Sequence, residues 1–235
     1  MSKNSTTYTL TFAAITTVVC GVVLALAASS LKPLQEANKV YEKKSDILAA
    51  VAYQGDDIEE AYDRYITEKV VNVNGEEIEV EGGAFNINAR KEREKPMEER
   101  NLPLFIFEKD DARYTIIPMN GSGLWGPIWG FVALDKHYRQ IGGMVFDHQA
   151  ETPGLGAEIN TAEFQDRFID KKVFDDESNF KPVRVLKGSG NVTNEHTVDG
   201  LSGATITCNG VTDMIENVLA QYKPYFEKNS KKIES

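Results

Sequence analysis

The stretch that decides the fold is "IWGFVALDKHYRQIGGMVFDH", residues 128–148. Two apolar runs, 128–135 and 141–148, flank a polar segment around Lys136 and His137. Runs of this length on either side of a short polar turn are typical of an antiparallel hairpin. The sequence therefore predicts a domain built on an antiparallel sheet.

Further elements are expected on both sides of this hairpin. Strands are predicted at 104–108, 113–119 and 181–188, and a helix at 161–170. The segment 208–226 carries apolar residues at helical spacing, which predicts a long amphipathic C-terminal helix. Its apolar stripe consists of Val211, Met214, Ile215, Val218, Leu219 and Tyr222. The fold class is therefore α+β, with a mainly antiparallel sheet flanked by helices.

The region before the sheet is more polar. Helices are predicted at 34–51 and 57–71, and an Asn-Gly turn with a short strand at 72–83. The charge run "KEREKPMEERN", residues 91–101, is interpreted as a solvated loop or helix end.

The N-terminal segment from Tyr8 to Leu31 has 24 residues and no charge. As a helix it spans roughly 36 Å, enough to cross a hydrocarbon core of ~30 Å. A cleaved signal peptide with Ala25-Leu26-Ala27 at the cleavage site is the alternative, but the apolar run exceeds the ~7–15 residues usual for such peptides. A lipoprotein anchor at Cys20 is disfavoured by the bulky Val19 before it. We expect one retained transmembrane helix.

Three regions are expected: a membrane anchor at 1–33, a helical or irregular connecting region at 34–100, and a ligand-binding domain at 101–235. The net charge of the chain is −10, and the only charged side chain in residues 1–31 is Lys3, so the remainder carries −11. An acidic surface repels phosphate backbones, so nucleic acid is not expected as a partner.

The charges that flank the predicted span bear on its orientation. Lys32, Lys39, Lys43 and Lys44 follow the span, against Lys3 and the α-amino group before it. A simple count by the positive-inside rule places the large domain in the cytoplasm, but that rule is weaker for large domains.

Cysteines and histidines indicate no metal centre. Cys20 lies within the predicted span and Cys208 outside it, so a disulfide between them is not expected. The three histidines are scattered, and no spacing matches that of metal ligands.

The loop "GSGLWG", residues 121–126, matches the glycine pattern of dinucleotide-binding proteins. That mechanism needs a helix directly after the loop, whereas Pro127 and a β-rich run follow, so the Rossmann interpretation fails. Two interpretations remain. Trp125 and Trp129 lie partly in the core, or the loop places Leu124 and Trp125 against a flat ligand.

The loop "ETPGLG", residues 151–156, has Pro153 and Gly154 at the central positions of a type II turn, and Gly156 adds a second permissive backbone. Such a loop can offer backbone N–H groups to a planar ligand, although an ordinary surface turn has the same composition. An acid–base cluster is a weaker alternative, since no spacing fixes its members on one face: Asp147, His148 and Glu151.

The stretch "DGLSGATIT", residues 199–207, places hydroxyls shortly before the C-terminal helix. Thr205 lies a few residues before that helix and Thr207 closer still. A helix N-terminus attracts phosphate through its unpaired N–H groups and its dipole, and Gly203 and Ala204 keep the approach open. The alternative is that one hydroxyl only caps the helix, either that of Ser202, Thr205 or Thr207.

"DGLSGATIT" resembles the signal for covalent FMN attachment, in which the last Thr of Asp-Gly-x-Ser-Gly-Ala-Thr is esterified to the flavin phosphate. "ETPGLG" is similar to the companion loop of the same FMN-binding domain family. Together with the "GLW" loop and the single span, the order of motifs resembles the C subunits of the sodium-translocating NADH:quinone oxidoreductases. The resemblance covers the span and residues 104 to about 225.

The resemblance implies that FMN is held covalently through Thr205. Ser202, Gly203, Ala204 and Thr207 would shape the phosphate site, and Asp199 opens the same motif. The ring would lie near residues of the other two loops: Glu151, Thr152, Gly154, Leu155, Leu124 and Trp125. The subunit would relay electrons one at a time within a sodium pump that links NADH to ubiquinone. No catalytic side chain and no metal ligand are expected in this chain.

The resemblance also implies partners and a location. Other membrane and flavin or iron–sulfur subunits would surround this one in the bacterial inner membrane, and an FMN transferase would attach the cofactor from FAD. The lipid bilayer holds the span, and the soluble domain lies on the periplasmic side, against the simple lysine count. Outside the cytoplasm no flavin pool replaces a lost cofactor, which is a physical reason for a covalent tether.

Two other functions remain open at this point. One is the G subunit of an Rnf-type ferredoxin:NAD oxidoreductase, which shares the anchor, the "ETPGLG" loop and the flavin threonine. The "GLW" loop and the setting of Leu201 favour the quinone-linked enzyme. The other is a membrane-anchored module that binds a phosphorylated ligand reversibly and does no redox work.

Overall fold

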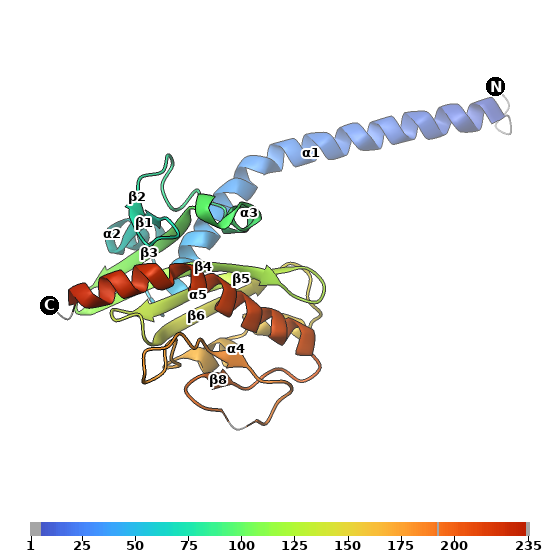
Figure 1. The fold of residues 1–235 in the computed structure, drawn as a ribbon. Helices are drawn as coiled ribbons and strands as arrows, with labels where there is room; N and C mark the ends of the chain where they lie inside the picture. Colours follow the sequence, from blue (N-terminus) through green and yellow to red (C-terminus); the bar gives the residue numbers. More distant parts are fainter. Residues whose placement is uncertain (1–5, 192, 234–235) are drawn as a thin grey trace. The chain divides into compact units, whose positions relative to one another are not determined.

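The computed structural model describes residues 6–191 and 193–233 (Figure 1). Lys3, which enters the orientation count, lies outside these residues. The chain divides into two compact units, Met1–Lys43 and Lys44–Ser235.

The first unit consists of most of helix α1, Thr6–Ala49. The most apolar 18-residue window of α1 has a mean hydropathy of 2.4 and none of it is buried, so α1 is a candidate membrane span by length and composition. The two segments predicted as helical at 8–31 and 34–51 thus form one helix. Residues 44–49 at its end belong to the second unit.

The second unit is built on a six-stranded sheet in the order β2-β1-β3-β4-β5-β6, in which every neighbouring pair is antiparallel. The predicted hairpin is confirmed as β5 and β6, paired from Ile128↔His148 to Leu134↔Ile141. The strands are β1 Ile66–Val71, β2 Glu77–Ile78, β3 Leu102–Lys109, β4 Ala112–Ser122, β5 Pro127–Asp135 and β6 Ile141–His148.

Both faces of the sheet are covered, because successive residues of a strand point to opposite sides. In β3, Leu104 and Ile106 join one hydrophobic core, whereas Phe105 and Phe107 join the other. This alternation explains why "LFIFE" is apolar without a period of two: each side chain has its own core to enter.

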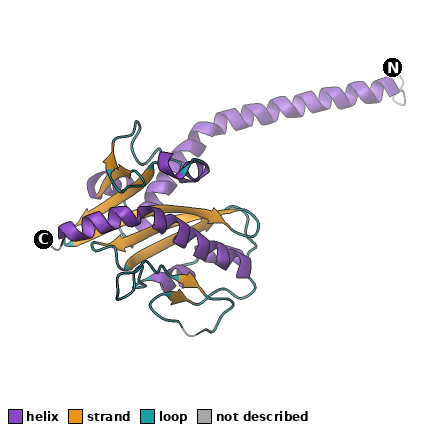
Figure 2. Ribbon diagram, viewed as in Figure 1, coloured by secondary structure: helices purple, strands orange, loops and turns teal. Residues whose placement is uncertain are grey.

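Helices and short strands cover the two faces (Figure 2). The α-helices of the second unit after α1 are α2 Ile58–Tyr65, α3 Ala89–Glu94, α4 Ala162–Gln165 and α5 Thr205–Ile233. Single 3-10 turns are η1 Met97–Glu99, η2 Gly156–Asn160 and η3 Asp166–Phe168, and two short strands, β7 Arg184–Val185 and β8 Thr197–Val198, form a separate parallel pair. The charge run at 91–101 holds the end of α3 and η1, as its interpretation as a helix end suggests.

The prediction of one helix over 57–71 is wrong in its second half. Helix α2 begins after Asp57, whose side chain accepts a hydrogen bond from the Glu60 N–H at 2.9 Å, and the chain becomes strand at Ile66. Four of the six residues "ITEKVV" are β-branched, and all six pair with β3. Side chains of this type lose rotamer freedom in a helix and pack well on a sheet.

Two further elements are shorter than predicted. The segment 161–170 forms only α4 and η3, and Asp170 ends it at a positive φ of 64°. The strand predicted at 181–188 contains only β7, since Gly188 and Gly190 follow it at φ of 80° and 78°. Its pairing with β8 is parallel and lies outside the main sheet.

Helix α5 lies across one face of the sheet, against β4 (Figure 1). The predicted apolar stripe is confirmed, because all six of its residues are buried, and the Tyr222 hydroxyl donates a hydrogen bond of 2.7 Å to the Pro103 carbonyl. Near the start of the helix, Gly210 faces the Ser122 carbonyl so closely that a Cβ on residue 210 would collide with that oxygen. This contact fixes the N-terminus of α5 beside the loop between β4 and β5.

Gly210→Ala should therefore destabilise the domain, although alanine is the better helix former. A methyl group pressed into backbone forces α5 away from β4, and such overpacking costs about 1–3 kcal/mol. Chemical denaturation of the purified protein measures this difference.

Asn209→Ala is the matched control, because residue 209 is exposed on the same helical turn. A Gly210→Ala protein as stable as this control would show that α5 does not depend on the close approach to Ser122.

Candidate functional site

The three motifs singled out in the sequence meet at one pocket of about 410 Å³, which we call the α5 pocket. Its walls come from the β4–β5 loop, the 151–156 loop and the first turn of α5, which are far apart in the chain. The residues that line it are Leu124, Trp125, Glu151, Thr152, Leu155, Gly156, Gly203, Ala204, Thr205, Ile206 and Thr207.

One wall of the α5 pocket is the N-terminus of a 29-residue helix. The prediction that Thr205 precedes this helix by several residues is wrong, since α5 begins at Thr205. The first helical bond runs from the Cys208 N–H to the Ala204 carbonyl at 2.9 Å, so Ala204 occupies the N-cap position. The N–H groups of residues 205–207 have no acceptor within the helix and form the positive end of its dipole.

The two threonines of this turn differ in environment. Thr207 is buried, and its hydroxyl donates a hydrogen bond of 2.7 Å to Glu151 Oε2. Thr205 is half-buried and lines the pocket, and within the described residues its hydroxyl has no hydrogen-bond partner. Neither threonine acts as a helix cap, so the capping alternative is not supported for them.

Of residues 121–126, the first two end β4 and residues 123–126 form the turn between β4 and β5, closed by a hydrogen bond of 2.8 Å from the Gly123 N–H to the Gly126 carbonyl. A strand follows this loop, which confirms that it is no Rossmann site. The alternative that Trp125 lies partly in the core is wrong: Leu124 is 48% exposed and Trp125 65% exposed. Trp129, in β5, is half-buried.

The 151–156 loop contains the predicted turn. The Leu155 N–H donates to the Thr152 carbonyl at 3.1 Å, and Gly154 has the positive φ of 76° that a type II turn requires at this position. The interpretation of Gly156 as a second permissive backbone is wrong, because its φ is not positive. Glycine is needed at this position because no space is left for a side chain. A Cβ on residue 156 would collide with Glu151 Oε2 and Thr207 Oγ1.

Glu151 connects all three walls of the pocket. Its side chain is 5% exposed, Oε1 accepts a hydrogen bond of 2.8 Å from the Trp125 N–H, and Oε2 accepts the one from Thr207. The acid–base alternative receives no support from these contacts, because His148 Nδ1 accepts from the Glu151 backbone N–H at 3.3 Å and does not contact the carboxylate. Asp147 Oδ1 accepts from the backbone N–H of His148 at 2.7 Å.

Three of the predicted site residues do not line the α5 pocket: Asp199, Ser202 and Gly154. Asp199 accepts hydrogen bonds from the N–H groups of Gly190 and Asn191, at 2.7 and 3.1 Å, and so orders the loop before β8. Partial burial raises the pKa of Asp199, but these hydrogen bonds outweigh it and hold the pKa below the usual range. Arg167 donates to the carbonyls of residues 199 and 200 and fixes the same segment from the other side.

Two lining residues were not among the predicted site residues, Gly156 and Ile206. Gly156 belongs to a quoted motif, but only the structure shows that a side chain there would fill the pocket wall. Ile206 is 56% exposed directly after Thr205. A large apolar residue at an exposed position of a first helical turn is the signal that would have found it.

Cys208, whose exposure the sequence left open, is buried directly behind the pocket. Its Sγ accepts a weak hydrogen bond of 3.4 Å from the Leu201 N–H, and burial raises the pKa of the thiol. Among residues 6–191 and 193–233, no group of three or more histidine, cysteine, aspartate or glutamate side chains could hold a metal ion.

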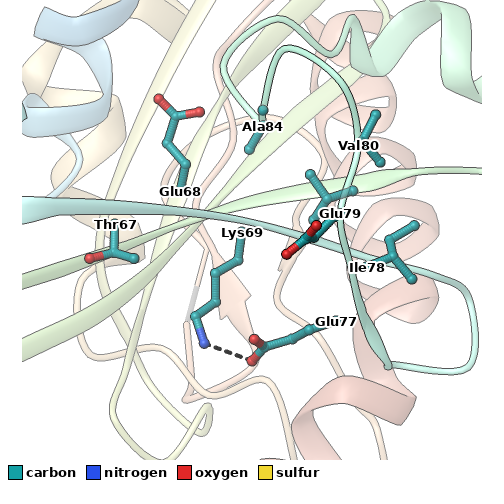
Figure 3. A pocket seen from close by; sticks show the side chains of 10 residues that line it. Thr67, Glu68, Lys69, Glu77, Ile78, Glu79, Val80 and Ala84 are labelled. Atoms are coloured by element: carbon teal, nitrogen blue, oxygen red, sulfur yellow. Dashed lines mark hydrogen bonds and ion pairs between the residues drawn. The ribbon is translucent and has the colours of Figure 1, made fainter.

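A second pocket, of about 620 Å³, lies where the chain leaves β2 and diverges from β1 (Figure 3). Lys69 and Glu77 form an ion pair of 2.7 Å at its edge. None of the residues predicted for the site lines this second pocket, so the α5 pocket is the candidate functional site.

Comparison with known proteins identifies the family of this chain. A family model described as the FMN-binding domain matches residues 123–220, which include "GLWG" of the first motif and the whole of the other two. The C subunit of the Na⁺-translocating NADH-quinone reductase of Vibrio vulnificus is 34% identical over 216 residues, covering 82% of each chain. This chain belongs to the same family. The corresponding C subunit of Neisseria meningitidis is 32% identical and covers 96% of this chain and 95% of its own.

Solved structures agree in fold. The crystal structure of the C subunit of this reductase from Parabacteroides distasonis has a TM-score of 0.75 and 35% sequence identity, and covers 83% of this chain and 96% of that one. The Shewanella oneidensis NqrC structure, 24% identical with a TM-score of 0.72, supports the fold alone. The family of these C subunits is the quinone-linked alternative rather than the Rnf-type one.

The lowered pKa of Asp199 predicts a pH dependence. Because the folded pKa lies below the unfolded one, its hydrogen bonds add stability above the ordinary aspartate pKa of about 3.9, and this contribution is lost as the pH falls through the folded pKa. Asp199→Asn should thus lower the free energy of unfolding at pH 7, by an amount that shrinks in acid. Urea denaturation at several pH values measures it.

Asp213→Asn is the control, since Asp213 is exposed on α5 and its carboxylate makes no hydrogen bond within the described residues. An Asp199→Asn effect that stays constant down to the most acidic pH would contradict the assignment.

Proposed function

We propose that the α5 pocket holds FMN and that Thr205 carries it through a phosphoester bond. The observation that supports this most is the convergence of three distant motifs on one half-buried hydroxyl at the start of a long helix, which has no hydrogen-bond partner in the part of the chain that the structure describes. A volume of about 410 Å³ suits a ligand of this size, since small-molecule sites occupy about 300–1,000 Å³.

The phosphate would lie at the N-terminus of α5. The N–H groups of residues 205–207, which have no acceptor among the described residues, and the helix dipole favour a negative group there, and Gly203, at a φ of 76°, leaves the approach to Thr205 open. In attachment from FAD, Thr205 Oγ forms a bond to the flavin-side phosphorus, and the bond from that phosphorus to the bridging oxygen of the pyrophosphate breaks. AMP leaves with the bridging oxygen, and the hydroxyl proton of Thr205 is released. We propose that a separate FMN transferase carries out this step, because the carboxylate of the pocket, Glu151, is hydrogen-bonded to Trp125 and Thr207 and not to Thr205.

The isoalloxazine ring would lie against the apolar part of the pocket. Leu124, Trp125 and Leu155 line it and are 48%, 65% and 40% exposed, an arrangement that is costly in water unless a flat apolar group or a partner covers it. These residues therefore fit the second interpretation of the "GLW" loop. They orient the ring and exclude water from one side.

FMN supplies the redox chemistry, and we propose that this subunit relays electrons between other redox centres of a sodium-translocating NADH-quinone reductase. The side chains of this chain bind the cofactor, orient it and set its electrostatic environment. No residue in the pocket is required to remove a proton from a substrate. The named relatives are subunits of that reductase, which supports the assignment.

The location follows the same proposal. Helix α1 anchors the subunit in the bacterial inner membrane, and the domain of residues 44–235 lies on the periplasmic side among other membrane and flavin or iron–sulfur subunits. The lysines after the span argue for the opposite orientation, but large domains translocate despite their charge.

Thr205→Val should abolish covalent attachment, because it keeps the shape of the side chain and removes the oxygen that forms the ester. Thr205→Ser should retain attachment. The measurement is in-gel flavin fluorescence after denaturing electrophoresis of full-length protein matured with its transferase, together with intact mass.

Thr207→Ser is the matched control, since it preserves the hydroxyl that contacts Glu151 and should leave the fluorescence at the wild-type level. Flavin that washes out of the denatured wild-type chain would refute the tether and favour the module that binds a phosphorylated ligand reversibly.

Alkaline phosphatase fused after residue 235 should be active in intact cells. This enzyme matures only where its disulfides form, outside the cytoplasm. A fusion directly before α1 should be inactive and serves as the control. The reverse pattern would place the domain in the cytoplasm, as the lysine count predicts.

A further inference from the structure

Glu151 is the one buried carboxylate among the residues that the structure describes. We propose that Glu151 is a positioning residue of the α5 pocket, which locks the "GLW" loop to the first turn of α5 and whose charge lowers the reduction potential of the flavin. This inference rests on the proposed function. The Glu151 side chain has two separate effects, one on the geometry of the pocket and one on the reduction potential of the flavin.

The geometric effect follows from the two carboxylate oxygens. Oε1 holds the backbone of Trp125 and Oε2 holds the hydroxyl of Thr207, so one side chain joins segments that are 26 and 56 residues away from it. The side chains of Leu124 and Trp125 are exposed, whereas the backbone of Trp125 is hydrogen-bonded to Oε1. The hydrogen bond to Oε1 therefore sets where the loop meets the ring.

The pocket is built around this carboxylate. A Cβ on Gly123 would collide with Oε1, and one on Gly156 would collide with Oε2. Two glycines thus leave the space that the Glu151 side chain fills. Loss of this side chain would leave a void against both loops and would leave the buried Thr207 hydroxyl unpaired, which carries a desolvation cost.

The same contacts distinguish the two hydroxyls of the first helical turn. Thr207 is bound to Oε2 and is buried, whereas Thr205, two residues earlier, is open to the pocket. Glu151 in this way leaves Thr205 as the hydroxyl of the turn that is available to a phosphate.

The electrostatic effect follows from burial without a counter-ion. Both oxygens accept hydrogen bonds, as an ionised carboxylate does, and no ion pair of Glu151 exists within residues 6–191 and 193–233. Glu151 is also the only charged residue that lines the α5 pocket. In a partly desolvated site a fixed negative charge opposes the addition of an electron to a neighbouring ring, so the reduction potential is lowered.

Substitution by glutamine separates the two effects. In Glu151→Gln, the amide oxygen still accepts from the Trp125 N–H, and the amide nitrogen donates to Thr207 Oγ1, which then acts as acceptor. The geometry is retained and the charge is lost. Glu151→Ala removes both contacts and the charge.

The experiment measures the covalent flavin content, the midpoint potential and the thermal unfolding of full-length protein matured with its transferase. Glu151→Gln should carry flavin at the wild-type level and unfold near the wild-type temperature, but with a higher midpoint potential. Glu151→Ala should lose most of the attached flavin. Glu216→Gln, which removes an exposed charge on α5, should leave the potential unchanged, since solvent screens that residue.

A Glu151→Gln protein with an unchanged potential would overturn the electrostatic effect. A Glu151→Gln protein that fails to fold or to carry flavin would overturn the claim that the hydrogen bonds of residue 151 position the loop without its charge. A Glu151→Ala protein with wild-type flavin content would overturn the positioning role. Wild-type protein without covalent flavin would instead refute the proposed function, so the two failures are distinct.

Discussion

The close packing of α5 on β4 is the constraint on which the rest of the domain depends. Gly210 lets the helix backbone approach the Ser122 carbonyl, and the apolar stripe of the helix fills the core on that face. Because Ser122 is the last residue of β4, the same contact brings the helix N-terminus to the loop that follows. A site made from distant segments thereby needs only one well-packed helix and one hairpin to align it.

The α5 pocket has a polar side and an apolar side, and each suits a different part of a ligand. Its polar side is a helix end whose first N–H groups have no acceptor within the helix, and its apolar side is formed by exposed residues of two loops. Glu151 lies between them and belongs to both, since it contacts the loop at Trp125 and the helix at Thr207. The site is therefore a joint between segments, and its shape depends on hydrogen bonds as much as on packing.

Sequence patterns predicted the elements whose signal is local. The β5–β6 hairpin and the stripe of α5 follow from periodicity, and the motifs identified the loops that meet at the pocket. The failures concern tertiary contacts: residues 66–71 became strand because β3 offered a partner, and Trp125 has an exposed ring while its backbone N–H is bound by Glu151. No pattern within "ETPGLG" reveals that Glu151 reaches Thr207, since that contact exists only after the chain has folded.

The burial of Cys208 has a practical consequence. A thiol that is 1% exposed and whose pKa is raised by burial forms little thiolate and reacts slowly with maleimides or oxidants. The other cysteine, Cys20, lies in the apolar helix α1. The folded domain of residues 44–235 therefore reacts slowly with such reagents. Once the exposed Cys20 of α1 is replaced, a spectroscopic probe attached to a cysteine introduced at the pocket rim would report from one known position.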